Sequence, residues 1–146
     1  MLRDVGASPA SPDSGAMGFS VLICDDLPAV QTMMRRMLER EGLVVAGLAS
    51  TADEVVSLYN ERQPDVVLLD LNMPGANGLG LLRTLRSLEP PACVVICSGA
   101  GDADLIDEAQ TLGAADWVLK PIYPSSLMAL LRTVHAASEA KRSVSR

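Results

Sequence analysis

Four apolar stretches of this sequence each end in side chains that can bind a metal ion or a phosphoryl group. These side chains are the acidic pair Asp25 and Asp26, then Asp70, Ser98 and Lys120. Carboxylates that lie close together repel one another, and each then tends to keep a proton. A hard divalent cation removes this conflict, because Mg²⁺ prefers oxygen ligands and commonly joins carboxylates to phosphate oxygens. The residue types therefore predict a Mg²⁺ site that also receives a phosphoryl group.

The two remaining side chains suit the phosphoryl group itself. The Lys120 ammonium would neutralise one phosphoryl oxygen, and the Ser98 hydroxyl would donate a hydrogen bond to another. Phosphoryl transfer depends mainly on positioning and charge neutralisation, so these groups suffice for it. A carboxylate nucleophile would form an acyl phosphate.

Such a site requires the four stretches to be neighbouring strands of one sheet. The stretches are residues 21–24, 66–69, 94–97 and 117–119, and a further strand is expected at residues 43–49. Their apolar residues run continuously, which is typical of strands that are covered by helices on both faces. Because parallel strands present their carboxyl ends at one edge of a sheet, that edge would gather the polar side chains.

Helical patterns alternate with the strands. They are expected over residues 27–41, from Thr51 onwards, around residues 81–88, over residues 102–112 and from Pro124 onwards. Apolar residues recur in them at helical spacing, and Thr51 with Glu54 forms a capping-box pattern. Short right-handed connections then predict an α/β fold, a doubly wound three-layer sandwich whose five-stranded parallel sheet has the order 2-1-3-4-5.

Composition bounds the domain organisation and the partners. Residues 1–18 are rich in Ser, Pro, Gly and Ala and are expected to be a disordered arm. Residues 19–138 are expected to form one domain, followed by a frayed tail over residues 139–146. The net charge of −6 argues against nucleic-acid binding. No stretch resembles a membrane span or a secretory signal, so no membrane contact and a cytoplasmic location are expected.

The three cysteines are expected to be structural. Cys24, Cys93 and Cys97 all fall within apolar, strand-like runs. Their number is odd and no metal-ligand spacing surrounds them, so reduced thiols packed in the core are the favoured interpretation.

At the positions above, the chain resembles the receiver domain of two-component response regulators, the chemotaxis-type (CheY-like) receiver family. The resemblance extends from about residue 20 to residue 138. It rests on Asp25-Asp26, on D-x-x-M-P-G at residues 70–75, on Ser98 followed by Gly99 and Ala100, and on Lys120-Pro121. It implies a flavodoxin-like fold and a signalling switch that catalyses only its own phosphorylation and dephosphorylation.

The resemblance also implies a role for each residue. Asp70 would be the phosphoacceptor and a Mg²⁺ ligand, Asp26 a direct Mg²⁺ ligand, and Asp25 a ligand acting largely through water. Asn72 lies where the family supplies a backbone carbonyl to Mg²⁺. The switch and phosphate-binding positions fall on Ser98, Trp117 and Lys120, with a cis peptide at Lys120-Pro121.

The resemblance implies partners as well. A sensor histidine kinase or a phosphotransfer protein would phosphorylate Asp70. The response would change partner binding on the face built from the 102–112 helix, the 117–119 strand and the last helix. That partner would be a downstream protein or a covalently linked output domain outside this chain, and a phosphorylation-dependent dimer is left open.

Two other functions would fit part of this pattern. A phosphatase of the haloacid dehalogenase type also uses an aspartate nucleophile and Mg²⁺. The sequence motif of that family is D-x-D, in which a second carboxylate lies two residues after the nucleophile. Here that position is Asn72, and the nucleophile follows the third strand rather than the first, which disfavours the enzyme. A phosphate-independent scaffold is disfavoured because the acidic site is complete.

Overall fold

A parallel sheet forms the centre of the molecule. The computed structural model describes residues 18–73, 77–99 and 101–145. The strands are β2 (Ser20–Cys24), β3 (Val44–Ala49), β4 (Val66–Asp70), β5 (Val94–Ser98) and β6 (Asp116–Leu119). They pair in the order β3-β2-β4-β5-β6, with every pair parallel. In chain order this is 2-1-3-4-5, so the predicted topology is confirmed.

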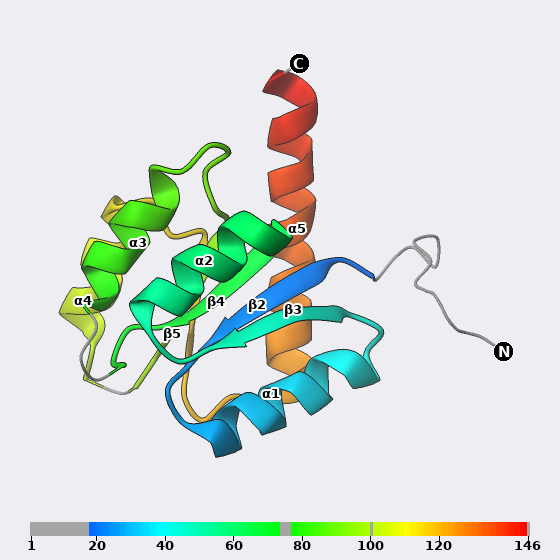
Figure 1. Cartoon of the computed structure of the whole chain (residues 1–146), viewed down its shortest axis with the longest axis vertical. Helices are drawn as coiled ribbons and strands as arrows, with labels where there is room; N and C mark the ends of the chain where they lie inside the picture. The colour runs from blue at the N-terminus through cyan, green and yellow to red at the C-terminus, as the bar shows by residue number, and fades with distance from the viewer. Residues whose placement is uncertain (1–17, 74–76, 100, 146) are drawn as a thin grey trace, which may run out of the picture.

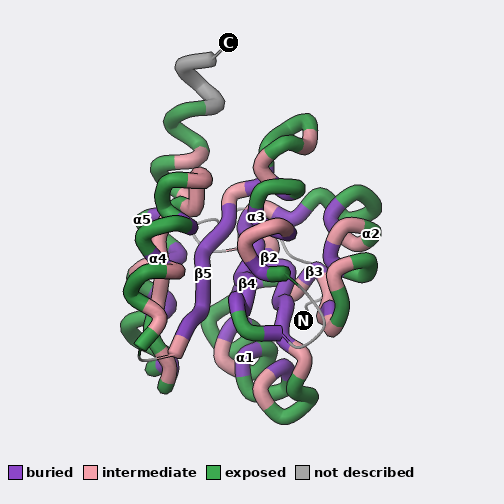
Figure 2. Tube along the Cα trace, turned by 90° about the vertical axis from the view of Figure 1, so that its left-hand side faces the viewer, coloured by how far each residue is buried: buried purple, intermediate pink, exposed green. Residues whose placement is uncertain are grey.

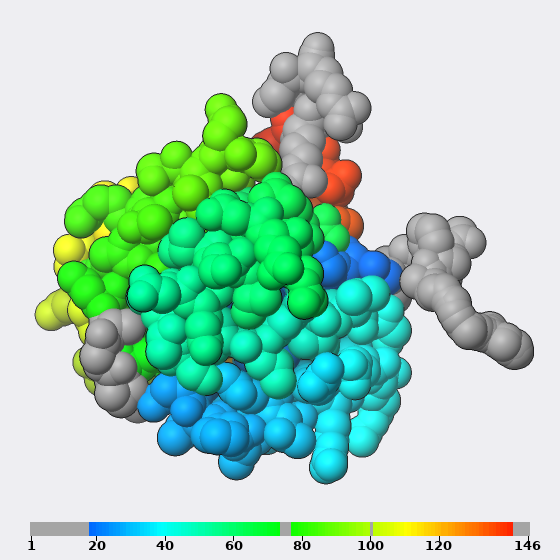
Figure 3. All heavy atoms as spheres, in the orientation of Figure 1, coloured from blue at the N-terminus to red at the C-terminus, as the bar shows by residue number. Residues whose placement is uncertain are grey.

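Helices cover both faces of this sheet (Figure 1). They are α1 (Pro28–Arg40), α2 (Ala52–Arg62), α3 (Gly78–Arg86), α4 (Ala103–Thr111) and α5 (Pro124–Ser145). Apolar residues of α1 and α5 pack in one core cluster, and those of α2, α3 and α4 pack in the other. In the space-filling view, α2 lies at the centre with α3 next to it, whereas α1 lies at the bottom, on the other side of the sheet (Figure 3). The predicted three-layer sandwich is therefore confirmed.

Successive strand residues enter opposite cores. In β2, Val21 and Ile23 pack with α1 and α5, whereas Leu22 and Cys24 pack on the other side. Both β4 and β5 are buried along their whole length, as the purple tube shows for β5 (Figure 2). This two-sided burial explains why the central strands are continuous apolar runs. It also fixes the register, because a slip of one residue would exchange the two cores.

Helix α2 begins with an N-cap at Thr51, as the capping-box pattern in the sequence predicts. The Thr51 hydroxyl accepts a hydrogen bond from the Glu54 backbone N–H at 3.2 Å. The Glu54 carboxylate in turn accepts from the backbone N–H of Ser50 at 2.7 Å. The return bond therefore reaches one residue before the N-cap, rather than the N-cap residue as in a standard capping box.

The structure can be compared with the expectation for the C-terminal end of the chain, but hardly with that for the N-terminal end. The expected arm over residues 1–18 lies outside the described residues apart from Gly18. At the other end, α5 continues to Ser145, whereas a frayed tail was expected from residue 139. No helix in the described part of the chain is long and apolar enough to cross a membrane.

The cysteines are thiols in or beside the core. Cys24 and Cys97 are buried, and the half-buried Cys93 packs against the cluster that contains α1 and α5. The structure thus agrees with a structural role for all three.

Candidate functional site

The carboxyl edge of the sheet brings the predicted polar residues together. Asp25 follows β2, Asp70 ends β4 and Ser98 ends β5. Lys120 follows β6, and its backbone N–H bonds to the Ser98 carbonyl at 2.8 Å. The Asp25 N–H bonds in the same way to the carbonyl of Ala49 at 3.0 Å. Hydrogen bonds between neighbouring strand ends thus hold the backbones of the site residues in place.

Three carboxyl groups form a compact cluster at this edge. One oxygen from each of Asp25, Asp26 and Asp70 lies within 4.8 Å of the others. Asp25 is 1% exposed and Asp70 is 4% exposed, whereas Asp26 is half-buried. Buried carboxylates lose hydration and repel one another, so the cluster requires compensating positive charge. A set of closely spaced oxygen ligands fits a hard divalent cation such as Mg²⁺.

Lys120 supplies positive charge to the two buried members of the cluster. Its Nζ lies 3.2 Å from Asp70 Oδ2 and 3.4 Å from Asp25 Oδ2. Partial burial lowers the pKa of Lys120, but the charges and hydrogen bonds of Asp70 and Asp25 outweigh this effect and raise the pKa above its usual value. The lysine is therefore a firmly protonated counterion for both aspartates.

The second oxygen of each buried aspartate is held by the backbone. Asp25 Oδ1 accepts a hydrogen bond from the Leu27 N–H at 3.0 Å. Asp70 Oδ1 accepts one from the Asn72 N–H at 2.9 Å. Aspartates often bond the backbone two residues on in this way. Each side chain is thereby oriented with its Oδ2 towards Lys120.

Gln31 on α1 holds the backbone next to the site by hydrogen bonds, and the sequence analysis did not identify this residue. Its side-chain amide donates to the carbonyl of Asp25 at 2.6 Å and to that of Ala49 at 3.3 Å. It also donates to the Ser50 hydroxyl at 3.1 Å. Gln31 is buried, which is unusual for glutamine and explained by these bonds. Its polar type on the inward face of a helix was the available signal.

Ser98 makes a contact that the sequence analysis did not foresee. Its hydroxyl is fully buried and donates to Asp102 Oδ2 at 2.6 Å. The same oxygen accepts from the side-chain amide of Asn72 at 2.9 Å and from the Gly99 N–H at 3.0 Å. Hydrogen bonds from Ser98 and Asn72 lower the pKa of Asp102. Asp102 was interpreted only as the start of a helix, so its side-chain contacts were missed.

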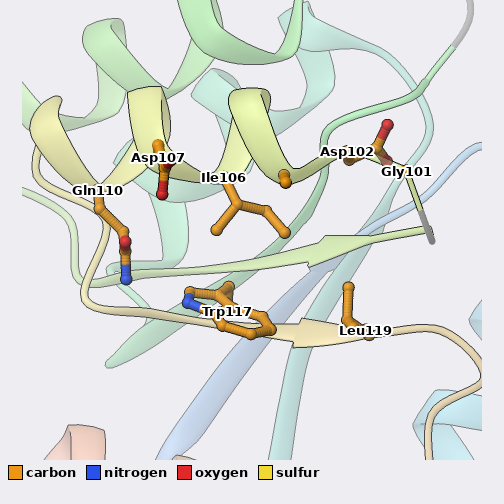
Figure 4. A pocket seen from close by; sticks show the side chains of 8 residues that line it. Gly101, Asp102, Ile106, Asp107, Gln110, Trp117 and Leu119 are labelled. Carbon is orange, nitrogen blue, oxygen red and sulfur yellow. The ribbon is translucent and has the colours of Figure 1, made fainter.

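Trp117 lies at a groove beside the site rather than inside it. The groove, between α4 and β6, has a volume of about 350 Å³ and is lined by Trp117, Ile106, Leu119 and the first residues of α4. Figure 4 shows the indole on β6 facing Ile106 of α4. In the strand register Trp117 pairs with Ile96, two residues before Ser98. Trp117 therefore lies on the edge strand β6, beside the middle of β5.

Other parts of the predicted motifs have mixed outcomes. The expected cis peptide at Lys120-Pro121 is present, and Glu89-Pro90 is also cis. Pro74, Gly75 and Ala100, which belong to two of the motifs, lie outside the described residues.

The sequence matches the family model of the response regulator receiver domain over residues 21–132. The chain belongs to this family. The matched range runs from the second residue of β2 into α5 and so contains all the residues of the cluster and of the Ser98–Asp102 contact. As a receiver domain of a two-component response regulator, the protein is a phosphoacceptor and a signalling switch.

Known receivers resemble this one in sequence and in structure. The chain is 35% identical to the chemotaxis protein CheY of Thermotoga maritima over 118 residues, which are 81% of this chain and 98% of that protein. It is 36% identical over 103 residues to the transcriptional regulatory protein MalR of Bacillus subtilis, covering 70% of this chain and 44% of MalR. The solved structure of NtrX from Brucella abortus superposes with a TM-score of 0.83 at 30% identity, covering 88% of this chain and 29% of NtrX. Similar receivers thus occur in short proteins and as parts of longer ones.

Proposed function

We propose that this receiver is phosphorylated on Asp70 in a Mg²⁺-dependent reaction, with a sensor histidine kinase or a phosphotransfer protein as the donor. The observation that supports this most directly is the cluster of three carboxyl groups within 4.8 Å, with Lys120 bonded to two of them. Receiver domains typically bind Mg²⁺ at such an acidic pocket. Asp70 is the member of the cluster that ends the central strand β4.

The residues present fit the metal. Asp25, Asp26 and Asp70 would hold Mg²⁺ together with the backbone carbonyl of Asn72, and all of these offer the oxygen atoms that the ion prefers. When bound, the ion neutralises charge on the phosphoryl oxygens. Since no cysteine or histidine is among the three clustered residues, the site does not favour a softer metal.

The transfer step uses the side chains in the following way. A carboxylate oxygen of Asp70 forms a bond to phosphorus while the bond between phosphorus and the donor's histidine nitrogen breaks. Lys120 Nζ, already 3.2 Å from Asp70 Oδ2, stays close to the new acyl phosphate and binds one of its oxygens. A carboxylate nucleophile, unlike a hydroxyl, loses no proton in the transfer, so the chain needs no separate general base. The receiver then catalyses only its own phosphorylation and dephosphorylation.

The phosphorylated state is read on the face formed by α4, β6 and α5. Ser98 follows Cys97, which pairs with Asp70 in the sheet, and Trp117 occupies β6 next to the groove. A shift of Ser98 towards the phosphoryl group would change how Trp117 packs in that groove. The binding partner would be a downstream protein or a linked output domain.

A phosphatase of the haloacid dehalogenase type has no supporting observation. Its acid/base carboxylate would fall at position 72, where the Asn72 side chain instead donates an amide hydrogen bond to Asp102. An amide cannot serve as that acid or base, and its hydrogen bond to Asp102 supports a positioning role for Asn72.

Asp70→Asn tests the proposal, since asparagine keeps the shape of the side chain and cannot form a stable acyl phosphate. The parent protein, incubated with Mg²⁺ and acetyl phosphate, is expected to gain the mass of one phosphoryl group. Asp70→Asn should gain none, and Asp53→Asn on the exposed surface of α2 should behave as the parent. Equal incorporation in Asp70→Asn and Asp53→Asn would show that the phosphoacceptor is another residue.

A further inference from the structure

We infer that Asp102 is a positioning residue that keeps the receiver in its unphosphorylated arrangement by accepting the hydrogen bond of the Ser98 hydroxyl. The inference rests on the proposed function, because it assumes that Ser98 answers to a phosphoryl group on Asp70. It adds a residue outside the acidic cluster and gives that residue a restraining role.

The side chain of Asp102 is turned away from its own helix. Asp102 is the N-cap residue of α4, where an aspartate usually accepts from the backbone N–H groups of the first turn. Its side chain makes no such cap bond. Instead a single oxygen, Oδ2, accepts from Ser98, Gly99 and Asn72 at 2.6, 3.0 and 2.9 Å. The carboxylate is therefore engaged by the site in place of its helix.

Ser98 cannot serve Asp102 and a phosphoryl group at the same time. A hydroxyl has one proton to donate, and that of Ser98 points to Asp102 at a distance typical of a charge-assisted bond. The side chain is fully buried, so water does not offer it another partner. A hydrogen bond to a phosphoryl oxygen on Asp70 thus requires the bond to Asp102 to break.

Asn72 links the same carboxylate to the phosphoacceptor. Its backbone N–H donates to Asp70 Oδ1 at 2.9 Å, while its side-chain amide donates to Asp102 Oδ2. A new group on Asp70 therefore acts on Asp102 through two routes, one through Asn72 and one through Ser98. Asp102 in turn lines the groove that contains Trp117 (Figure 4). Breaking the hydrogen bonds of Asp102 would therefore change the packing at the start of α4 and in that groove.

The structure therefore describes two exclusive partners for one hydroxyl. The equilibrium between the two arrangements depends on how strongly the Asp102 carboxylate and the phosphoryl group each accept the hydrogen bond of the Ser98 hydroxyl. Weakening the acceptor at position 102 should favour the activated arrangement even without phosphorylation. Loss of one hydrogen bond to a charged group corresponds to a shift of about tenfold in such an equilibrium.

Asp102→Asn is the variant that tests this, because it keeps the shape and replaces the anion with a weaker, neutral acceptor. Asp104→Asn is the matched control: Asp104 is exposed in the first turn of α4 and its substitution removes the same charge. Amide and indole N–H NMR signals of Ser98, Gly99 and Trp117 are recorded for each protein, before and after Mg²⁺ with beryllofluoride. In Asp102→Asn without beryllofluoride, these signals should lie part of the way towards their activated positions in the parent. In Asp104→Asn they should not.

A second variant keeps the inference testable if asparagine happens to preserve the bond. In Ser98→Ala the hydroxyl is absent, so adding Asp102→Asn to it should move the Trp117 signal much less than in the parent. Equal movement in both backgrounds would overturn the role of the Ser98–Asp102 bond, as would identical spectra for Asp102→Asn and Asp104→Asn. Failure of the parent to respond to beryllofluoride would instead count against the proposed site at Asp70.

Discussion

Lys120 decides the electrostatics of the resting site. It is the cation that contacts both buried aspartates, and its side chain is 31% exposed. Removing one partner of a buried ion pair leaves charge in a poorly solvated place, which costs more than the pair itself contributes. The lysine therefore has a structural role before it has a chemical one.

Substitution of Lys120 should reveal this structural role. Lys120→Met keeps the aliphatic length and removes the charge, so the free energy of unfolding should fall by about 2 kcal/mol in the absence of divalent ions. Millimolar Mg²⁺ should restore more stability to this variant than to the parent, because an ion takes over the neutralisation. Denaturant titrations measure both effects, and Lys141→Met removes an exposed lysine as the control. Equal losses in the two variants would contradict the prediction.

The pH dependence of the Lys120 contribution has a defined sign. The pKa of Lys120 is raised in the folded protein, so folding favours the protonated form. The stabilisation is fully present below the unfolded pKa of about 10.4 and is lost as the pH rises through the higher folded value. The difference in stability between the parent and Lys120→Met should therefore be constant at neutral pH and disappear only in strong alkali.

At the level of elements, α2 offers a clean test of local structure. Thr51→Ala removes the hydroxyl that caps the Glu54 N–H and should lower the free energy of unfolding by about 1 kcal/mol. Ser57→Ala, in the exposed middle of the same helix, should have almost no effect or stabilise slightly, because alanine is the better helix former. Thermal unfolding of both variants gives the comparison. A smaller loss for Thr51→Ala than for Ser57→Ala would exclude the cap.

The elements and their order could be predicted because they follow from local pattern. Continuous apolar strands, helical spacing and short connections leave few alternatives to the sheet that is observed. The cluster of Asp25, Asp26 and Asp70 could be predicted too, since these residues stand at strand ends, as does Lys120. The roles of Asp102 and Gln31 could not be predicted in this way. Their hydrogen bonds depend on how a loop and a helix face turn in space, which residue spacing does not determine.

At the scale of the whole molecule, each of the two cores buries a thiol, and burial disfavours its ionisation to the reactive thiolate. Burial raises the pKa of Cys24, and it raises that of Cys97 to about 12. Both thiols therefore stay protonated in the folded protein at pH 8, where an unfolded cysteine is partly ionised. The folded state binds more protons than the unfolded state in alkali, so these residues reduce stability as the pH rises above about 8.5.

Thiol titration should distinguish the three cysteines. With a thiol-specific disulfide reagent at pH 8, at most the half-buried Cys93 should react before unfolding. Cys93→Ser should then show no rapidly reacting thiol, and all remaining thiols should become reactive together in denaturant. Rapid reaction of either remaining thiol in folded Cys93→Ser would mean that the core opens locally, near β2 for Cys24 or near β5 for Cys97.

The contact of Lys120 with Asp25 and Asp70 has a consequence for the supply of ions in the protein's surroundings. A fold whose acidic centre depended on magnesium would be unstable whenever the metal was scarce. Here an internal cation is covalently part of the chain and cannot be diluted away. Scarcity of the metal would therefore slow signalling, but it would leave the receiver folded and able to respond when the metal returned.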